Sequence, residues 1–110
     1  MKLEVHERLA LLELLPLESD YAGWLEIRVA KETLELTPEE KLYINFREEI
    51  NQGVKQLLWD TQKSLDAVKD IPVSNYITGI IREKLADLSK KKKLQEKYFS
   101  VFEKFVAMYK

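Results

Sequence analysis

The chain has 110 residues, of which 45% are hydrophobic and 34% charged, and its formal net charge is −1. This composition predicts one globular domain spanning residues 1–110, and the absence of cysteine excludes a disulfide framework and thiolate metal sites. No apolar run reaches the roughly 18 to 20 residues that a membrane span needs, so we expect a cytoplasmic protein without membrane contact.

A leucine-rich segment opens the chain and predicts the first helix, from Leu3 to Leu15. Leucine favours helix formation, and Pro16 cannot continue the hydrogen-bond ladder, so the helix is expected to end just before this proline. Apolar residues fall on more than one of its faces. We therefore expect a helix that is buried on most sides or that forms part of a partner surface.

The second element follows an N-cap at Ser19-Asp20. Its periodicity fits two structures. The alternation of Leu25, Ile27 and Val29 indicates a half-buried strand, whereas the wider spacing of apolar residues over 21–34 indicates a helix. We favour the helix and keep the strand as the alternative.

The third helix has a clear start signal. Thr37 supplies an N-cap hydroxyl, Pro38 fits the first helical position and Glu40 stands three residues after the cap, which together form a capping box. Apolar residues continue at helical spacing, and Gly53 fits a helix end. A helix is therefore predicted from Pro38 to Ile50.

Two β-favouring segments follow. Val54–Trp59 is apolar, and Val68–Val73 is a second candidate strand, interrupted at Pro72. The polar residues 60–66 separate them. This arrangement predicts a two-stranded hairpin with a loose loop, which needs helices packed on it to be stable.

Two apolar stripes at helical spacing end the chain. The first begins after a cap at Ser74-Asn75, and the second runs from Leu94 to Tyr109. Four lysines lie between the stripes, so the region is either two amphipathic helices or one long helix with a solvated break. Gly79 lies inside the first stripe, where glycine costs about 1 kcal/mol relative to alanine. That cost suggests the close approach of another backbone, within the fold or from a partner.

The order of the elements defines the expected fold. Three helices, a hairpin and one or two further helices correspond to a winged-helix-like core with a C-terminal helical extension. The predicted class is therefore α+β and mostly helical.

Four segments carry a resemblance to a known group of proteins. They are a run of leucines ending in Leu-Pro, a capped glutamate pair, a Trp-Asp pair after an apolar strand, and an aromatic terminal helix: Leu3–Pro16, Leu36–Glu40, Trp59-Asp60 and Leu94–Phe105. Together they resemble small phage and prophage proteins of unknown function. The resemblance implies a phage-type origin and supplies no catalytic residues.

Few residues point to catalysis or metal binding. His6 is the only histidine, so one chain cannot build a histidine-rich metal site. Adjacent glutamates such as Glu39-Glu40 and Glu48-Glu49 diverge by about 100° on a helix, and the first pair already lies at a helix start. The three glycines do not have phosphate-loop spacing. We expect a non-enzymatic protein with no catalytic residue, metal or cofactor.

Charge is unevenly distributed along the chain. Residues 1–60 contain seven Lys or Arg against thirteen Asp or Glu, while residues 61–110 contain eleven against six. The basic half offers a candidate patch for an acidic partner or a nucleic acid: Arg82, Lys84, Lys90, Lys91, Lys92, Lys93 and Lys97. Nucleic acid is the less favoured ligand, because the predicted third helix, which would read the major groove, is rich in glutamate.

A second candidate surface is the aromatic end of the chain, where apolar residues extend beyond one helical face: Tyr98, Phe99, Phe102, Phe105 and Tyr109. We interpret these residues as a surface for a protein partner or for self-association. The favoured function is a phage-type protein-interaction module that acts in assembly, as an adaptor or on the host, in the host cytoplasm. The alternative is a winged-helix-like nucleic-acid-binding regulator that uses the basic half.

Overall fold

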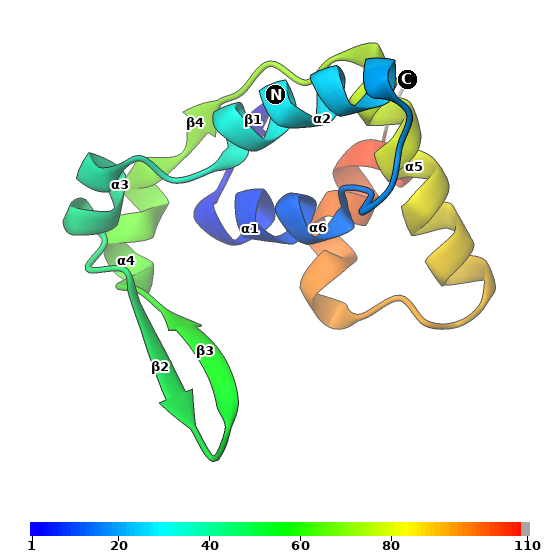
Figure 1. The fold of residues 1–110 in the computed structure, drawn as a ribbon. Coiled ribbons are helices and arrows are strands. Elements are labelled where there is room, and N and C mark those ends of the chain that lie inside the picture. Colours follow the sequence, from blue (N-terminus) through cyan, green and yellow to red (C-terminus); the bar gives the residue numbers. More distant parts are fainter. Residues whose placement is uncertain (109–110) are drawn as a thin grey trace.

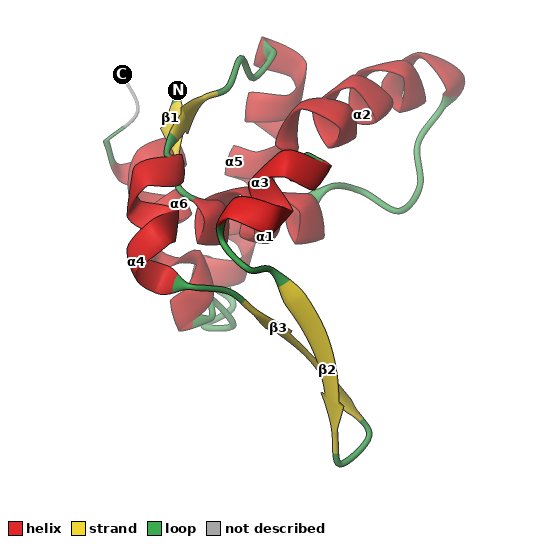
Figure 2. Ribbon diagram, turned by 90° about the vertical axis from the view of Figure 1, so that its left-hand side faces the viewer, coloured by secondary structure: helices red, strands yellow, loops and turns green. Residues whose placement is uncertain are grey.

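The structure is a computed structural model that describes residues 1–108. It confirms a mostly helical α+β fold in which three helices, a hairpin and a C-terminal helical extension follow one another (Figures 1 and 2). The helices are α1 (Val5–Leu14), α2 (Tyr21–Leu34), α3 (Pro38–Tyr43), α4 (Thr61–Ser64), α5 (Asn75–Lys90) and α6 (Phe99–Phe102). The strands are β1 (Lys2–Leu3), β2 (Arg47–Asn51), β3 (Val54–Leu58) and β4 (Lys69–Asp70).

The first two helices form close to where the sequence predicts them. α1 begins after Glu4, whose amide donates to Glu7 Oε1 at 2.9 Å, and it ends before the proline. α2 begins after Asp20, whose Oδ1 accepts a hydrogen bond from the Gly23 amide at 2.8 Å. The alternative of a strand over residues 21–34 is therefore wrong.

The third helix is shorter than predicted. Its capping box is present, because Thr37 Oγ1 accepts from the Glu40 amide at 3.1 Å and Glu40 Oε1 accepts from the Thr37 amide at 3.0 Å. The helix nevertheless ends at Tyr43. Asn45 then adopts a left-handed φ of 54°, which turns the chain out of the helical path. The following residues, which were predicted to be helical, form β2.

The predicted hairpin forms between a different pair of strands. β3 pairs antiparallel with β2 and not with the segment Val68–Val73. Gly53, predicted to end a helix, lies in the turn that joins β2 to β3. The segment 68–73 contributes only β4, which pairs with β1 at the N-terminus, Lys2 opposite Asp70. The prediction of a hairpin was thus correct, but its turn lies at Gln52-Gly53 and not at residues 60–66.

The polar residues 60–66 are helical and do not form a loose loop. Asp60 Oδ1 accepts from the amides of Gln62 and Lys63 at 3.0 and 3.1 Å, and this caps α4. A 3₁₀ turn, η1 (Leu65–Ala67), continues the segment. These turns carry the chain from the hairpin to β4, along one side of α3 (Figure 1).

Two helical segments with a break between them end the described chain, which is one of the two predicted alternatives. Ser74 Oγ accepts from the Ile77 amide at 3.2 Å where α5 begins. After α5, Lys92 has a φ of 58° and redirects the chain. The last segment consists of a 3₁₀ turn, η2 (Glu96–Tyr98), α6, and a π-helical turn, η3 (Glu103–Ala107). No helix within residues 1–108 is long and apolar enough to cross a membrane.

Most apolar side chains form one core between α1, α2, α5 and the C-terminal segment. Its fully buried members include Leu3, Leu11, Ile27, Leu34, Ile71, Ile77, Ile81, Leu85, Val101 and Phe105. A smaller cluster of Val5, Leu36 and Ile44 lies beneath the base of the hairpin. α1 contributes to both clusters, which explains why its apolar residues occupy several faces, as predicted.

Two neighbouring charged residues of α1, Glu7 and Arg8, are fully buried. Glu7 accepts hydrogen bonds from Lys104 Nζ, at 2.7 Å, and from Ser100 Oγ, which both belong to the C-terminal segment. Arg8 donates to Glu40 Oε2 at 2.5 Å and to two backbone carbonyls at the end of α2. No buried side-chain nitrogen or oxygen in residues 1–108 lacks a partner. The two charges therefore attach α1 to opposite parts of the fold.

The expectation that another backbone approaches Gly79 within the fold is wrong. Gly79 is exposed in the middle of α5, and a Cβ atom built there would have no heavy atom within 4 Å. We therefore expect Gly79→Ala to raise the free energy of unfolding by about 0.5 to 1 kcal/mol, because alanine favours the helix and loses less backbone entropy. Urea unfolding followed by circular dichroism measures this change. A decrease in stability would contradict the open environment of this residue.

Candidate protein-interaction surface

The hairpin formed by β2 and β3 projects from the rest of the molecule (Figures 1 and 2). Its side chains are mostly exposed, and several of these are apolar: Ile50 is 79% exposed, Val54 61% and Leu57 37%. An isolated two-stranded ribbon has unpaired backbone groups on both edges and little stability of its own. Such a ribbon is a candidate contact element for another protein.

A two-residue turn fixes the register of the hairpin. Gln52 and Gly53 have φ values of 53° and 78°, as a type I′ turn requires at both central positions. Glu48 then lies opposite Leu57, and Ile50 opposite Lys55. Because side chains alternate between the faces of a strand, these four residues share one face, which we call the inner face: Glu48, Ile50, Lys55 and Leu57.

The base of the hairpin is attached firmly to the body. The rings of Phe46 and Trp59 stack with their centroids 6.3 Å apart and their planes at 14°. The Asp60 amide donates to the Ile44 carbonyl at 2.7 Å, and Ile44 itself is fully buried. The hairpin is therefore anchored at its root, while its tip has no contact with the body that would bury Ile50.

Two adjoining clefts, of about 470 and 340 Å³, lie between the inner face and α1. They share Leu9, Lys55 and Leu57, and we call the two clefts together the docking groove. Its apolar lining comprises Leu9, Ala10, Leu12, Leu36, Phe46, Leu57 and Trp59, and its polar lining comprises His6, Glu13, Glu35, Lys41, Glu48, Lys55 and Lys97. Apolar walls with a polar rim are typical of protein-binding sites.

The charges at the rim of the docking groove are largely paired. Lys97 Nζ lies 2.8 Å from Glu13 Oε2, and Lys55 Nζ lies 3.4 Å from Glu48 Oε1. The hydrogen bond from Lys97 lowers the pKa of Glu13, with a smaller contribution from the hydroxyl of Tyr98, although partial burial opposes both. The lowered pKa keeps the Glu13 carboxylate ionised near neutral pH, whereas a general acid needs a raised carboxyl pKa.

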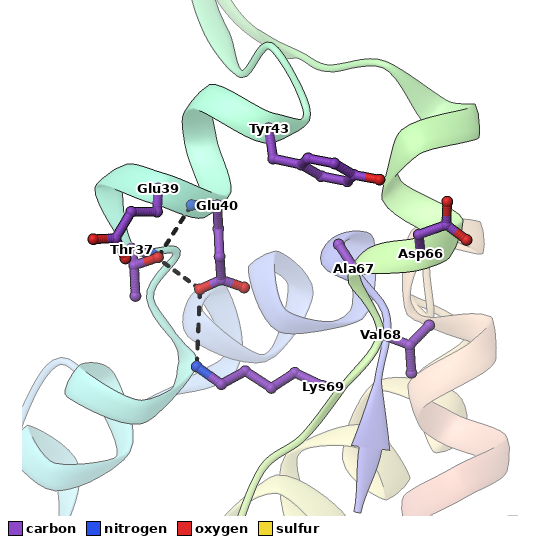
Figure 3. A pocket seen from close by; sticks show the side chains of 8 residues that line it. All are labelled: Thr37, Glu39, Glu40, Tyr43, Asp66, Ala67, Val68 and Lys69. Atoms are coloured by element: carbon purple, nitrogen blue, oxygen red, sulfur yellow. Dashed lines mark hydrogen bonds and ion pairs between the residues drawn. The ribbon is translucent and has the colours of Figure 1, made fainter.

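A third cleft, of about 460 Å³, lies between α3 and the η1 turn (Figure 3). Glu40 is its central charged group. Burial alone would raise the pKa of Glu40, but the bonds from Arg8 and Thr37, together with the charges of Arg8 and Lys69, lower it to about 2. Figure 3 shows Glu40 held by Thr37 and Lys69. This carboxylate is thus occupied by structural contacts, as the capping motif predicted.

Within residues 1–108, three side chains at the start of α1 have ligand atoms close enough together to share a metal ion. The ligand atoms of Glu4, His6 and Glu7 lie within 4.8 Å of one another, and His6 is exposed, as the sequence predicted. Burial would raise the pKa of Glu7, but the hydrogen bonds from the Glu4 amide, Lys104 and Ser100 outweigh it and hold the pKa below its ordinary value. Because an ammonium group already contacts Glu7, a divalent cation would be repelled there.

The structure separates the aromatic residues that the sequence placed on one partner surface. Tyr98 and Phe105 are buried in the main core, and Phe102 is half-buried against it. Phe99 is 60% exposed, and Tyr109 lies outside the described residues. The buried pair is not available to a partner, because the last stripe packs its main face onto α1 and α5. Among the described members, Phe99 alone remains fully on the surface.

The predicted basic patch is on the surface, but part of its charge is paired. Its described residues are exposed along α5, in the break after it, and at η2: Arg82, Lys84, Lys90, Lys91, Lys92, Lys93 and Lys97. Lys91 Nζ lies 3.0 Å from Asp87 Oδ2, one helical turn away, and Lys97 is paired with Glu13. The patch and the acidic α3 occupy different parts of the molecule (Figure 1).

The inner face of the hairpin was not predicted from the sequence. Residues Glu48 and Ile50 were placed on a helix, where they would not share a face with Lys55 and Leu57. A local signal did exist, because Gly53 ends the short polar segment Asn51-Gln52-Gly53, and a polar segment that ends in glycine is typical of a turn between two strands. The groove itself has no local signal, since it depends on α1 lying beside the hairpin.

Comparison with known proteins gives no relative from which a function could be transferred: no family model, no curated protein and no solved structure matches this chain. The residues and geometry described above are therefore the basis for any functional conclusion.

Proposed function

We propose that the protein is a non-enzymatic protein-interaction module of phage or prophage type, which acts in assembly, as an adaptor or on the host, in the host cytoplasm. The observation that supports this function best is the projecting hairpin, whose inner face and docking groove leave apolar side chains in water. Ile50 is 79% exposed at the end of this surface. Apolar side chains grouped on a projecting element gain most when a partner covers them.

The rest of the molecule is less suited to such contact. The third cleft is centred on Glu40, which structural bonds already hold, and the aromatic stripe is largely core. The basic residues favour the alternative of a nucleic-acid-binding regulator, yet a lysine run without interleaved aromatic residues gives only weak, sequence-independent attraction. The hairpin is therefore the preferred contact surface.

Site-specific photo-crosslinking tests the proposed surface. We expect a photoreactive benzoylphenylalanine at position 50 to form covalent protein adducts in host extract, because Ile50 lies on the contact surface. The matched control carries the same group at position 25, where Leu25 is 48% exposed on α2. Adducts should form at position 50 and resist nuclease.

Two results would overturn the proposal. Adducts that form at position 25 and not at position 50 would move the contact surface to α2. Adducts that disappear after nuclease treatment would support the nucleic-acid alternative, and binding of DNA at low salt that is lost on substitution of Lys90 and Lys93 would support it independently.

A further inference from the structure

The inner face of the hairpin has an arrangement of charge that is complementary to itself. Its four side chains lie at the corners of a grid, with Glu48 beside Leu57 and Ile50 beside Lys55. The charged residues therefore occupy one diagonal, which the 3.4 Å contact between Lys55 and Glu48 confirms, and the aliphatic residues occupy the other. A half-turn about the aliphatic diagonal exchanges the acidic corner with the basic corner.

We propose that the hairpin of a second copy of this chain occupies the docking groove, so that the two inner faces pack crosswise about a twofold axis. Around that axis, Glu48 of each copy faces Lys55 of the other, while Ile50 faces Ile50 and Leu57 faces Leu57 of the other copy. Twofold contacts require one surface to be complementary to itself, and sheets pack face to face at aligned or steep angles. This inference rests on the proposed function and names its partner.

The docking groove would add contact area to such an interface. The inner face looks toward α1, since Glu48, Lys55 and Leu57 line the clefts between them. A second hairpin packed on this face would lie along the groove, next to the wall that Leu9 contributes. Four side chains alone would fall short of the roughly 800 Å² per partner that stable interfaces bury.

Exchange of the two charges tests this geometry. Glu48→Lys alone and Lys55→Glu alone each place like charges across the twofold axis, and each should raise the dissociation constant of the dimer at least about tenfold. In an equimolar mixture of the two variants, opposite charges face each other again. In each variant, positions 48 and 55 of one hairpin carry the same charge, so the ion pair within that hairpin is lost and does not return on mixing. Recovery of the dimer in the mixture would therefore come from contacts between the two copies.

Sedimentation velocity over a range of concentrations measures the result. We expect the wild type to move from monomer toward dimer as concentration rises, each single variant to remain monomeric at the same concentrations, and the mixture to recover the dimer. Ile50→Ser provides a further variant with an intact charge pair, and it should also weaken the dimer, at little risk to folding because Ile50 is exposed. The controls Glu32→Lys and Lys90→Glu change the same charges on exposed residues of α2 and α5 and should dimerise like the wild type.

Several outcomes would overturn the inference: a wild type that stays monomeric, single variants that dimerise normally, or a mixture that does not recover. A monomeric wild type that still forms adducts with a different protein at position 50 would reject the second copy and leave the proposed function intact. A wild-type dimer that Ile50→Ser does not weaken would place the dimer contact elsewhere.

Discussion

Replacing Arg8 with alanine is expected to lower the free energy of unfolding by about 3 to 5 kcal/mol. The guanidinium is fully buried and donates to Glu40 and to the carbonyls of Leu34 and Glu35, at distances of 2.5, 3.0 and 2.7 Å. Removing it takes a charged donor from the two carbonyls and from the Glu40 carboxylate, which keeps its bond from the Thr37 amide, and it also leaves a cavity in place of the buried side chain.

Arg28→Ala is the matched control, because Arg28 is exposed on α2, and its effect should lie within about 0.5 kcal/mol. Urea unfolding followed by circular dichroism at neutral pH gives both values. A loss below about 1 kcal/mol in the Arg8 variant would mean that water replaces the buried donors and that the contact is not structural.

The pH dependence gives a second measurement of the same contact. The pKa of Glu40 is about 2 in the folded protein, against an ordinary value of 4.5. A lowered pKa stabilises the fold above pH 4.5, and this contribution, of about 3 kcal/mol, is lost as the pH falls from 4.5 toward 2. Glu7 and Glu13, whose pKa values are also lowered, act in the same direction. The decrease in stability over this range should therefore be smaller in Arg8→Ala than in the wild type.

Phe105→Ala is expected to cost about 3 to 5 kcal/mol, measured in the same unfolding experiment. Phe105 is fully buried in the main core, and its η3 turn packs against α5. Truncation removes the apolar surface of the ring and leaves a cavity that the neighbouring helices cannot fill completely.

Phe99→Ala is the matched control for Phe105→Ala, because it removes the same aromatic ring from an exposed position. Phe99 lies in the same stripe but is 60% exposed, so its truncation should change the free energy of unfolding by no more than about 0.5 kcal/mol. If Phe105→Ala left stability unchanged and altered the oligomeric state, the aromatic stripe would be an interface after all. That result would restore the hypothesis that the sequence suggested.

The buried charges of α1 connect stability to the proposed contact surface. Arg8 joins α1 to the start of α3, directly before the hairpin, while Glu7 joins α1 to the C-terminal segment through Lys104 and Ser100. Arg8 therefore ties α1, which forms one wall of the docking groove, to the segment that leads into the hairpin. A destabilised Arg8 variant is consequently unsuitable for testing partner binding, and the exposed hairpin residues are the better targets.

Short-range signals in the sequence predicted much of the helical structure. The N-caps at Asp20, Thr37 and Ser74 are present, and α1 ends before Pro16. These features depend on groups within about four residues of one another, so local chemistry specifies them. The predicted end of α3 was wrong. The apolar residues keep their helical spacing past Tyr43, but Asn45 turns the chain out of the helix.

The mostly helical α+β class, the starts of the main helices, the break after α5 and the presence of a hairpin could be predicted from local patterns. The strand pairing, the burial of Glu7 and Arg8, the different exposure of Phe105 and Phe99, and the groove between α1 and the hairpin arise from tertiary packing. Packing of this kind joins residues that lie far apart along the chain. Lys2 pairs with Asp70, and Glu7 contacts Lys104, and no local spacing specifies which distant segment will cover a given face.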